Sequence, residues 1–253
     1  MKIAITGKGG VGKTTLSATL AWIFAGEGKK VLAIDADPDA NLAAALGVSA
    51  QELAKVKPIA EMTSLIEERT GSKPGAPGGV YKLNPRVDDI PEGFGLRLGN
   101  IILLATGKSK EAASGRYCPE NVLLRRLLKH LVTERDEVVV IDMEAGIEHL
   151  TRGTAQGVDA FIVVVEPGQR SIQTARSVKE MAKGLGVKKV YAVANKVKSE
   201  SDVAFIGKEL DIPLLGSLSY DPLVVEADMQ GQAPFKFSEG LLREVRSIRE
   251  KIV

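Results

Sequence analysis

The chain has 253 residues, of which 44% are hydrophobic and 26% charged, a mix typical of one large or two small globular domains with a full core. Its 34 Lys and Arg against 32 Asp and Glu leave a formal net charge of +2, too small to predict binding to nucleic acid or membranes. The single cysteine excludes an intrachain disulfide and a four-cysteine cluster. Because no apolar run is long enough for a membrane span and the first residues read as a strand, we expect a cytoplasmic protein.

Short β-branched runs alternate with longer helical patterns along the chain. The run from Val138 to Ile141 is continuously apolar, as strands buried on both faces require. Strand, helix and strand in this order predict an α/β fold, a mostly parallel sheet flanked by helices on both faces in three layers. The expected strands are residues 2–6, 31–35, 101–105, 138–142, 160–166, 190–195 and 213–218, and the expected helices are 13–25, 121–132 and 171–184.

Residues 69–99 interrupt this alternation with Pro74, Pro77, Pro85 and Pro91 among many glycines. This density excludes a regular helix, and it predicts a surface insertion with one strand near residues 80–83. Too little chain precedes the segment to complete a separate α/β core. We therefore expect a single domain over residues 1–253 that carries this insertion.

The C-terminal residues form an amphipathic pattern at helical spacing, in which Leu241, Val245 and Ile248 share one face with Leu242 and Ile252. Ser238 precedes them as a candidate cap. We expect this helix to pack on the body of the protein rather than on a membrane.

Residues 7–14, Gly-Lys-Gly-Gly-Val-Gly-Lys-Thr, fit the phosphate-loop pattern G-x-x-x-x-G-K-[ST] between a predicted strand and a predicted helix. The glycines let backbone N–H groups point at a phosphate, and the helix start adds partial positive charge. Lys13 can neutralise β- and γ-phosphate oxygens, and the Thr14 hydroxyl can bind Mg²⁺. We expect a P-loop ATPase whose ATP-binding residues include Gly7, Lys8, Gly9, Gly10, Val11, Gly12, Lys13, Thr14 and Thr15.

Three carboxylates follow predicted strands. Asp35 and Asp37 are two residues apart at the end of one strand, and Asp142 ends another. Ligands bind at the carboxyl ends of parallel strands, where a carboxylate can hold Mg²⁺ through water. Each aspartate alone is a weak signal, because aspartates are common in turns after strands. Three of them beside a phosphate loop indicate a magnesium site, for which Thr14 and Asp142 are the candidate ligands.

Asn195 and Lys196 close a further strand, and we expect both to belong to the ATP site. The amide of Asn195 offers a donor and an acceptor to a purine edge. A turn-capping role is the alternative for this asparagine. Residues 219–222 are a further candidate wall of the base pocket.

Cys118 precedes Pro119, which suits the first position of a helix, so the thiol is expected at the N-cap, where the helix dipole favours ionisation. A thiolate is a good ligand for Zn²⁺ or Ni²⁺. On the local sequence alone, a small buried thiol without a further role is favoured over a metal ligand.

Lys8 at the second position of the loop resembles the deviant phosphate loop of the MinD/ParA-like ATPases. This resemblance implies that Lys8 crosses a dimer interface to the partner's nucleotide. It also implies that Asp35 belongs to the surroundings of Mg²⁺, that Asp37 orients the attacking water, and that Asn195 binds adenine. The catalytic residues expected on this basis are Lys8, Lys13 and Asp37.

Residues 117–128 and 142–150, with residues 83–89, resemble the CooC-type accessory ATPases of carbon monoxide dehydrogenase, and the likeness runs from residue 1 to about 231. It implies a Mg²⁺-dependent ATPase that dimerises on binding ATP and assists nickel insertion into a client enzyme, as a metallochaperone. That family typically carries Cys-x-Cys; here Arg116 stands in the first position and only Cys118 remains. A symmetric dimer would then offer two thiolates to Ni²⁺ or Zn²⁺. Neither His130 nor His149 has ligand spacing to Cys118, and we expect both to be structural.

The alternative function is a MinD/ParA-like positioning or partition ATPase acting on membrane or DNA. A membrane role would favour a longer, more apolar C-terminal end, so neither nucleic acid nor stable membrane binding is expected. An electron donor with a bridging metal cluster needs two cysteines per subunit, and the single Cys118 excludes it.

Overall fold

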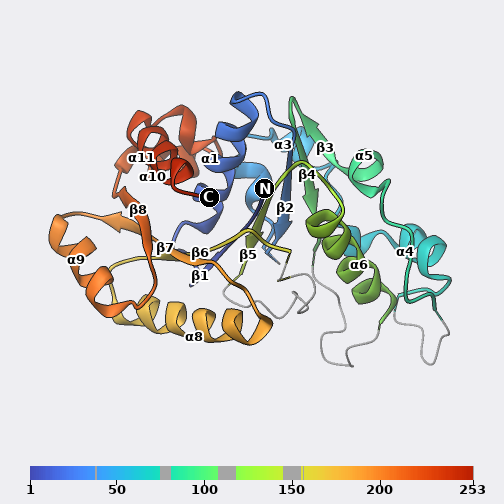
Figure 1. Ribbon diagram of the computed structural model, residues 1–253. Coiled ribbons are helices and arrows are strands. Elements are labelled where there is room, and N and C mark those ends of the chain that lie inside the picture. The colour runs from blue at the N-terminus through green and yellow to red at the C-terminus, as the bar shows by residue number, and fades with distance from the viewer. Residues whose placement is uncertain (38, 75–80, 108–117, 145–154, 156, 253) are drawn as a thin grey trace.

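The computed structural model describes residues 1–37, 39–74, 81–107, 118–144, 155 and 157–252. Its centre is an eight-stranded sheet in the order β3-β4-β2-β5-β1-β6-β7-β8 (Figure 1). Every neighbouring pair is parallel except β3 and β4. The predicted α/β fold is therefore confirmed. The strands are β1 (Lys2–Gly7), β2 (Val31–Ala36), β3 (Leu96–Leu98), β4 (Ile101–Ala105), β5 (Val138–Met143), β6 (Ala160–Val165), β7 (Val190–Val197) and β8 (Leu214–Ser219).

The central strands are buried on both faces, and their side chains alternate between two apolar clusters. In β6, Phe161 and Val163 belong to one cluster, while Ile162 and Val164 belong to the other. Successive side chains of a strand point to opposite faces, so a continuous apolar run fills two cores at once. This is why the strands were recognisable as uninterrupted hydrophobic segments.

Helices cover both faces of the sheet (Figure 1). One cluster includes residues of α1 (Lys13–Gly26), α2 (Leu42–Ala45) and α11 (Glu239–Glu250). The other includes residues of α4 (Thr63–Thr70), α6 (Pro119–Thr133), α8 (Gln169–Leu185) and α9 (Glu200–Glu209). The shorter elements are α3 (Ala50–Leu53), η1 (Ile59–Glu61), α5 (Ile90–Phe94), α10 (Pro222–Met229) and η2 (Pro234–Lys236).

The segment at residues 69–99 differs from its prediction in two ways. It contains the short helix α5, which the proline and glycine density was expected to exclude; Pro91 lies in its first turn, where the missing N–H costs no hydrogen bond. The expected strand near residues 80–83 is absent at 81–83, and Val80 lies outside the described residues. Instead, β3 pairs antiparallel with β4 across a tight turn in which Gly99 has a φ of +59°.

The amphipathic C-terminal helix packs on the body, as predicted. The Ser238 hydroxyl accepts the N–H of Leu241 at 2.9 Å and caps α11. Leu241, Val245 and Ile248 are buried against the cluster that includes α1. In the part of the chain that the structure describes, no helix has the length and apolarity to cross a membrane.

Candidate active site

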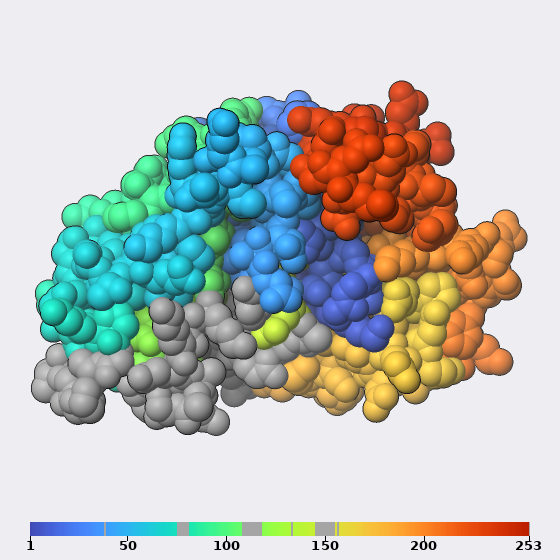
Figure 2. Space-filling model, turned by 180° about the vertical axis from the view of Figure 1, so that it is seen from behind, coloured from blue at the N-terminus to red at the C-terminus, as the bar shows by residue number. Residues whose placement is uncertain are grey.

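Five neighbouring strands, β2, β5, β1, β6 and β7, end at the same edge of the sheet. Their ends bring together the phosphate loop after β1, Asp35, Asp142, Glu166 and Asn195. In the view of Figure 2, the dark-blue N-terminal segment reaches the surface between light-blue and yellow segments, which come from other parts of the chain. The site is thus assembled by the sheet topology from residues distant in sequence, as binding sites of parallel sheets are.

The phosphate loop has the backbone that its glycines were expected to permit. Gly10 and Gly12 have φ of +76° and +94°, in the left-handed region that favours glycine. A Cβ on Gly7 would lie 2.5 Å from the carbonyl oxygen of Val164 on the neighbouring strand. The N-cap residue of α1 is Gly12, which has no side chain to cap the first N–H groups of the helix. The first N–H groups of α1 therefore offer a binding site for an anion.

Lys13 and Asp37 are brought together at this site. Lys13 is buried, with 7% of its surface exposed, and its Nζ lies 3.8 Å from Oδ2 of Asp37. Asp37 also accepts the N–H of Asp39 at 3.1 Å, which holds its carboxylate in place. A buried ammonium next to the phosphate loop is positioned to neutralise phosphate charge.

Asp35 lies directly opposite Asp142, on β2 and β5. Its carboxylate accepts the N–H of Asp37 at 3.2 Å and that of Leu42 at 2.8 Å. Burial raises the pKa of Asp35 to about 7, and the negative charges of Asp142 and Asp37 add to this shift. The carboxylate therefore lies in surroundings that lack compensating positive charge.

Asp142 accepts the hydroxyl of Ser17 at 3.0 Å and is hydrogen-bonded by Thr14. Burial raises its pKa to about 6, against the opposing effect of these hydroxyls and of Lys13. Its second oxygen, Oδ2, is buried and has no hydrogen-bond partner among the described residues. An unpartnered buried carboxylate oxygen beside Thr14 fits a water ligand of Mg²⁺.

Thr14, Asp35 and Asp142 do not form a metal site made of protein ligands alone. Within the described ranges, no three His, Cys, Asp or Glu side chains are grouped so that they could hold a metal ion together. Mg²⁺ keeps several waters and is usually held by a few protein oxygens together with substrate phosphates. The donors present, the Thr14 hydroxyl with Asp35 and Asp142 nearby, fit that mode of binding.

Asn195 and Lys196 hold the outside of the phosphate loop. Asn195 is buried, and its Nδ2 donates to the carbonyl of Val11 at 2.6 Å, while Lys196 Nζ donates to the carbonyl of Gly10 at 2.6 Å. The Asn195 Oδ1 accepts the N–H of Lys196 at 2.8 Å, and Lys196 has a positive φ of +57°. The residue expected at adenine thus binds the loop through one N–H and one lone pair, and its second N–H and second lone pair are the groups that a purine would use.

Residues 219–222, the other candidate wall of the base pocket, make contacts that stabilise the fold. The Ser219 hydroxyl donates to Glu244 at 2.7 Å, and the Asp221 carboxylate accepts the N–H of Leu223 at 2.9 Å and caps α10. Tyr220 is 46% exposed and lies beneath the Lys198 ammonium, which is 5.2 Å from its ring centre.

Two residues of the site were not predicted, Glu166 and Ser17. The Glu166 carboxylate lies 3.1 Å from Lys8 Nζ and 3.7 Å from Lys196 Nζ. Its sequence signal was its place at the end of a predicted strand, the feature that singled out Asp142. Ser17 lies one turn after Thr14 on α1, so helical spacing places both hydroxyls on one face.

Cys118 is the N-cap of α6, with Pro119 at the first helical position, as predicted. The thiol is buried, with 6% of the residue exposed. His130 contacts Glu134 through its Nδ1 at 2.9 Å. Arg116 and His149, which bear on the expected metal site, lie outside the described residues.

Comparison with known proteins agrees with this geometry. The family model of the CobQ/CobB/MinD/ParA nucleotide-binding domain matches residues 2–235. The chain is 50% identical over 239 residues to the carbon monoxide dehydrogenase accessory protein CooC of Rhodospirillum rubrum, covering 94% of this chain and 90% of that protein. It is 43% identical to an uncharacterised ATP-binding protein of Methanocaldococcus jannaschii, covering 100% of this chain and 98% of that protein.

Solved structures support the fold. The septum site-determining protein MinD of Pyrococcus horikoshii, in complex with Mg-ADP, superposes with a TM-score of 0.68 at 21% identity, covering 99% of this chain and 95% of that one. A ParA-family ATPase of Chlorobium tepidum gives a TM-score of 0.71 at 15% identity, covering 96% and 95%. These similarities concern the fold of the three-layer domain.

Proposed function

The chain belongs to the CobQ/CobB/MinD/ParA nucleotide-binding family and is an ATP hydrolase of this family; from this premise we propose that it dimerises on ATP and assists the maturation of carbon monoxide dehydrogenase or a related nickel enzyme. The observation that carries the proposal is the 50% identity to a carbon monoxide dehydrogenase accessory protein, over a chain whose phosphate loop and strand-end aspartates form one site. The remaining steps concern what each residue of that site does.

The phosphate loop and Lys13 bind the triphosphate. Backbone N–H groups at the start of α1 contact its oxygens, and the buried Lys13 ammonium neutralises the charge that develops toward the γ-phosphate. Asp37, which lies 3.8 Å from Lys13, orients the attacking water. Catalysis by this site is positioning and electrostatic stabilisation, because phosphoryl transfer demands little covalent chemistry of the protein.

In this proposal Thr14, Asp35 and Asp142 would hold Mg²⁺, because hydroxyl and carboxylate oxygens are the donors that this ion prefers. When bound, the ion neutralises phosphate charge in the transition state. It also compensates the two buried carboxylates, whose pKa values are raised in its absence. Ser17 positions Asp142 by donating to its Oδ1.

Lys8 completes the site of the partner subunit. Its side chain is 38% exposed and, among the described residues, its ammonium pairs with Glu166 of its own chain. Breaking this partly exposed ion pair lets Lys8 reach a second copy. Two loops facing each other across a dimer would each receive a lysine from the opposite chain. ATP then favours the closed dimer because its γ-phosphate contacts Lys8 only in that state.

Nickel is the cargo in this proposal, and Cys118 is its ligand. Two subunits would offer two thiolates, one from each helix α6, where the helix dipole favours the ionised thiol. Two thiolates supply only part of a tetrahedral Zn²⁺ site or of a planar Ni²⁺ site, so both metals are tested. Anaerobic titration with Ni²⁺ and Zn²⁺, with and without ATP, on the wild type and Cys118→Ser tests this step; identical curves for both proteins would remove Cys118 from it.

The ATPase step is tested by the specific ATPase activity at increasing protein concentration. Wild-type activity should rise with concentration as dimers form, and Lys8→Ala should lose this rise. Equal rates for Lys8→Ala and wild type at every concentration would contradict the cross-subunit role.

The client is tested by nickel loading of purified metal-free carbon monoxide dehydrogenase in the presence of ATP and either the wild type or Lys13→Ala. We expect the wild type to increase loading and Lys13→Ala not to. Equal loading with the wild type, with Lys13→Ala and without either protein would contradict the proposed client.

A further inference from the structure

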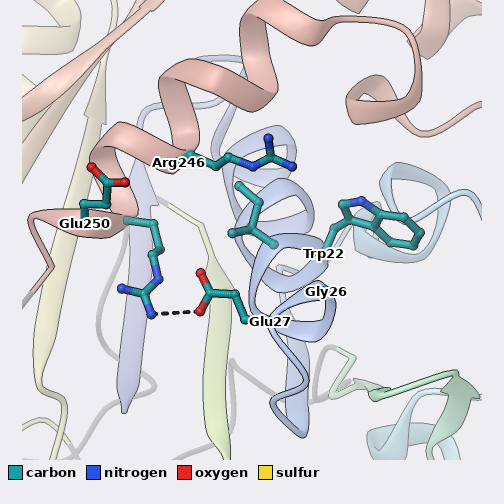
Figure 3. A pocket seen from close by; sticks show the side chains of 7 residues that line it. Trp22, Gly26, Glu27, Arg246 and Glu250 are labelled. Atoms are coloured by element: carbon teal, nitrogen blue, oxygen red, sulfur yellow. Dashed lines mark hydrogen bonds and ion pairs between the residues drawn. The ribbon is translucent and has the colours of Figure 1, made fainter.

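A pocket of about 470 Å³ lies between α1 and α11, away from the phosphate loop (Figure 3). Its lining comes from Trp22, Ile23, Gly26 and Glu27 of α1 and from Arg246 and Arg249 of α11, with Glu250 at one end. Trp22 follows Lys13 by nine residues, which is roughly 14 Å along the helix axis. The pocket is therefore separate from the nucleotide site, and its volume is within the range of small-molecule sites.

One part of the pocket is aromatic and open. Trp22, the one tryptophan of the sequence, is 45% exposed. Its ring stacks on Phe235, with ring centres 4.8 Å apart and planes 16° from parallel, so one face of the indole is covered and the ring is held in place. Gly26 lies one turn further along the same side of α1. Apart from its chain neighbours and the backbone of its own helix, no described residue has an atom within 4 Å of the position that its Cβ would take. A flat ligand can therefore approach closely beside Trp22.

The two arginines of the pocket differ in their partners. Arg249 donates to Glu27 at 2.8 Å, and its guanidinium lies 5.1 Å from the ring centre of Phe24, so its charge is engaged. Arg246 is exposed and has no hydrogen bond or ion pair with any residue that the structure describes. Figure 3 shows its side chain extending toward the side of Trp22, while Glu250 lies at the opposite end. The cation without a partner is thus next to the aromatic surface.

We propose that this pocket binds a small planar aromatic carboxylate. The ring packs beside Trp22 and over Ile23, and the carboxylate accepts hydrogen bonds from the Arg246 guanidinium, whose fork of donors matches carboxylate geometry. Arg246 repels a cationic ligand, and a neutral ring gains no ion pair from this exposed guanidinium. This site does not depend on the proposed function of the chain.

The single tryptophan makes the test site-specific. Naphthoate is titrated into isotope-labelled full-length protein, and the one indole N–H signal is followed by NMR. We expect a saturable shift of that signal by naphthoate, and a much weaker one by naphthalene methanol, which lacks the charge, or by cyclohexane carboxylate, which lacks the flat ring. No saturable shift with naphthoate, or an equal shift with naphthalene methanol, would overturn the proposal.

Four variants locate the binding. Arg246→Gln should weaken the binding of naphthoate about tenfold, since it removes a charge-assisted hydrogen bond. Arg243→Gln, an exposed arginine of α11 outside the pocket lining, is the matched control and should bind as the wild type does. Gly26→Leu should fill the open space and abolish binding. Equal affinities for the two arginine variants would refute the site, and retained binding by Lys13→Ala would show that it is independent of nucleotide binding.

Discussion

Lys8 Nζ lies 3.1 Å from Oε1 of Glu166 in the same subunit, and Oε2 of that carboxylate lies 3.7 Å from Lys196 Nζ. These side chains are partly exposed, so the ion pairs themselves contribute at most about 1 kcal/mol to stability. Their importance lies in where they keep Lys8: the Glu166 carboxylate holds it on its own chain, whereas our proposal requires it at the nucleotide of the partner. Forming the ATP dimer then requires the contact between Lys8 and Glu166 to break.

Glu166→Gln should therefore favour dimerisation. Neutralising the carboxylate releases Lys8. Two such contacts break in each symmetric dimer, so about 0.5 to 1 kcal/mol per contact corresponds to a roughly five- to thirtyfold lower protein concentration at half-dimerisation. Analytical ultracentrifugation with a non-hydrolysable ATP analogue measures this shift. Glu180→Gln, on the exposed side of α8, is the matched control and should leave the midpoint unchanged. An unaltered midpoint in Glu166→Gln would show that the contact does not restrain Lys8.

Gly12→Ala should abolish nucleotide binding. A Cβ at this position would lie 2.2 Å from Nδ2 of Asn195, and the φ of +94° is strained for any residue with a side chain. The phosphate loop must then shift away from Asn195. Gly28→Ala has a similar strain, with a φ of +79° but open space around it, so it should lose about 1 kcal/mol of stability and still bind ATP. Calorimetric titration with ATP distinguishes the two, and ATP binding by Gly12→Ala would disprove the role of this contact.

The buried Asp35 predicts a pH dependence of stability. Its pKa of about 7 in the folded protein exceeds its ordinary value of 3.8, so the stability contributed by the neutral acid is fully present below about pH 3.8 and is lost as the pH rises through about 7. Asp35→Asn keeps an oxygen to accept the Leu42 N–H and cannot ionise. Without nucleotide or Mg²⁺ it should be more stable than wild type at about pH 8, by on the order of 1 to 3 kcal/mol.

Urea unfolding of wild type and Asp35→Asn at about pH 8 and about pH 5 measures this difference. The gap should narrow at the lower pH, where wild-type Asp35 holds its proton in the folded state. A gap of the same size at both pH values would mean that ionisation of Asp35 does not destabilise the metal-free protein.

How far the sequence predicted this site depends on whether contacts are local or distant. The phosphate loop was recognisable because its glycines, Lys13 and Thr14 are contiguous. The cap of α6 at Cys118 was predictable because Pro119 is adjacent to it. The contact of Glu166 with Lys8 was not, because β6 lies beside β1 only through the sheet order, and no pattern within residues 160–166 encodes that neighbour.

The prediction of the strands likewise depended on whether the signal was local in the sequence. The central strands were predicted because burial on both faces requires continuous apolar runs. The edge strand β3 has three residues, none of them fully buried, and it lies among prolines and glycines, so its sequence carried no such signal. Its pairing with β4 depends on the turn at Gly99, which tertiary structure selects.

The docking of α11 on β8 can be tested by a pair of compensating substitutions. A Cβ on Gly216 of β8 would lie 2.8 Å from Cγ1 of Ile248, which is buried on α11. Ile248→Ala alone should cost about 2 to 5 kcal/mol through the cavity it leaves, and Gly216→Ala alone about 1 to 3 kcal/mol through overpacking. In the double variant the new methyl occupies part of the cavity, so its loss should be smaller than the sum by about 1 kcal/mol. Denaturant unfolding of the wild type, the two single variants and the double variant measures the coupling. Strictly additive losses of stability would show that Ile248 does not lie against position 216 as described.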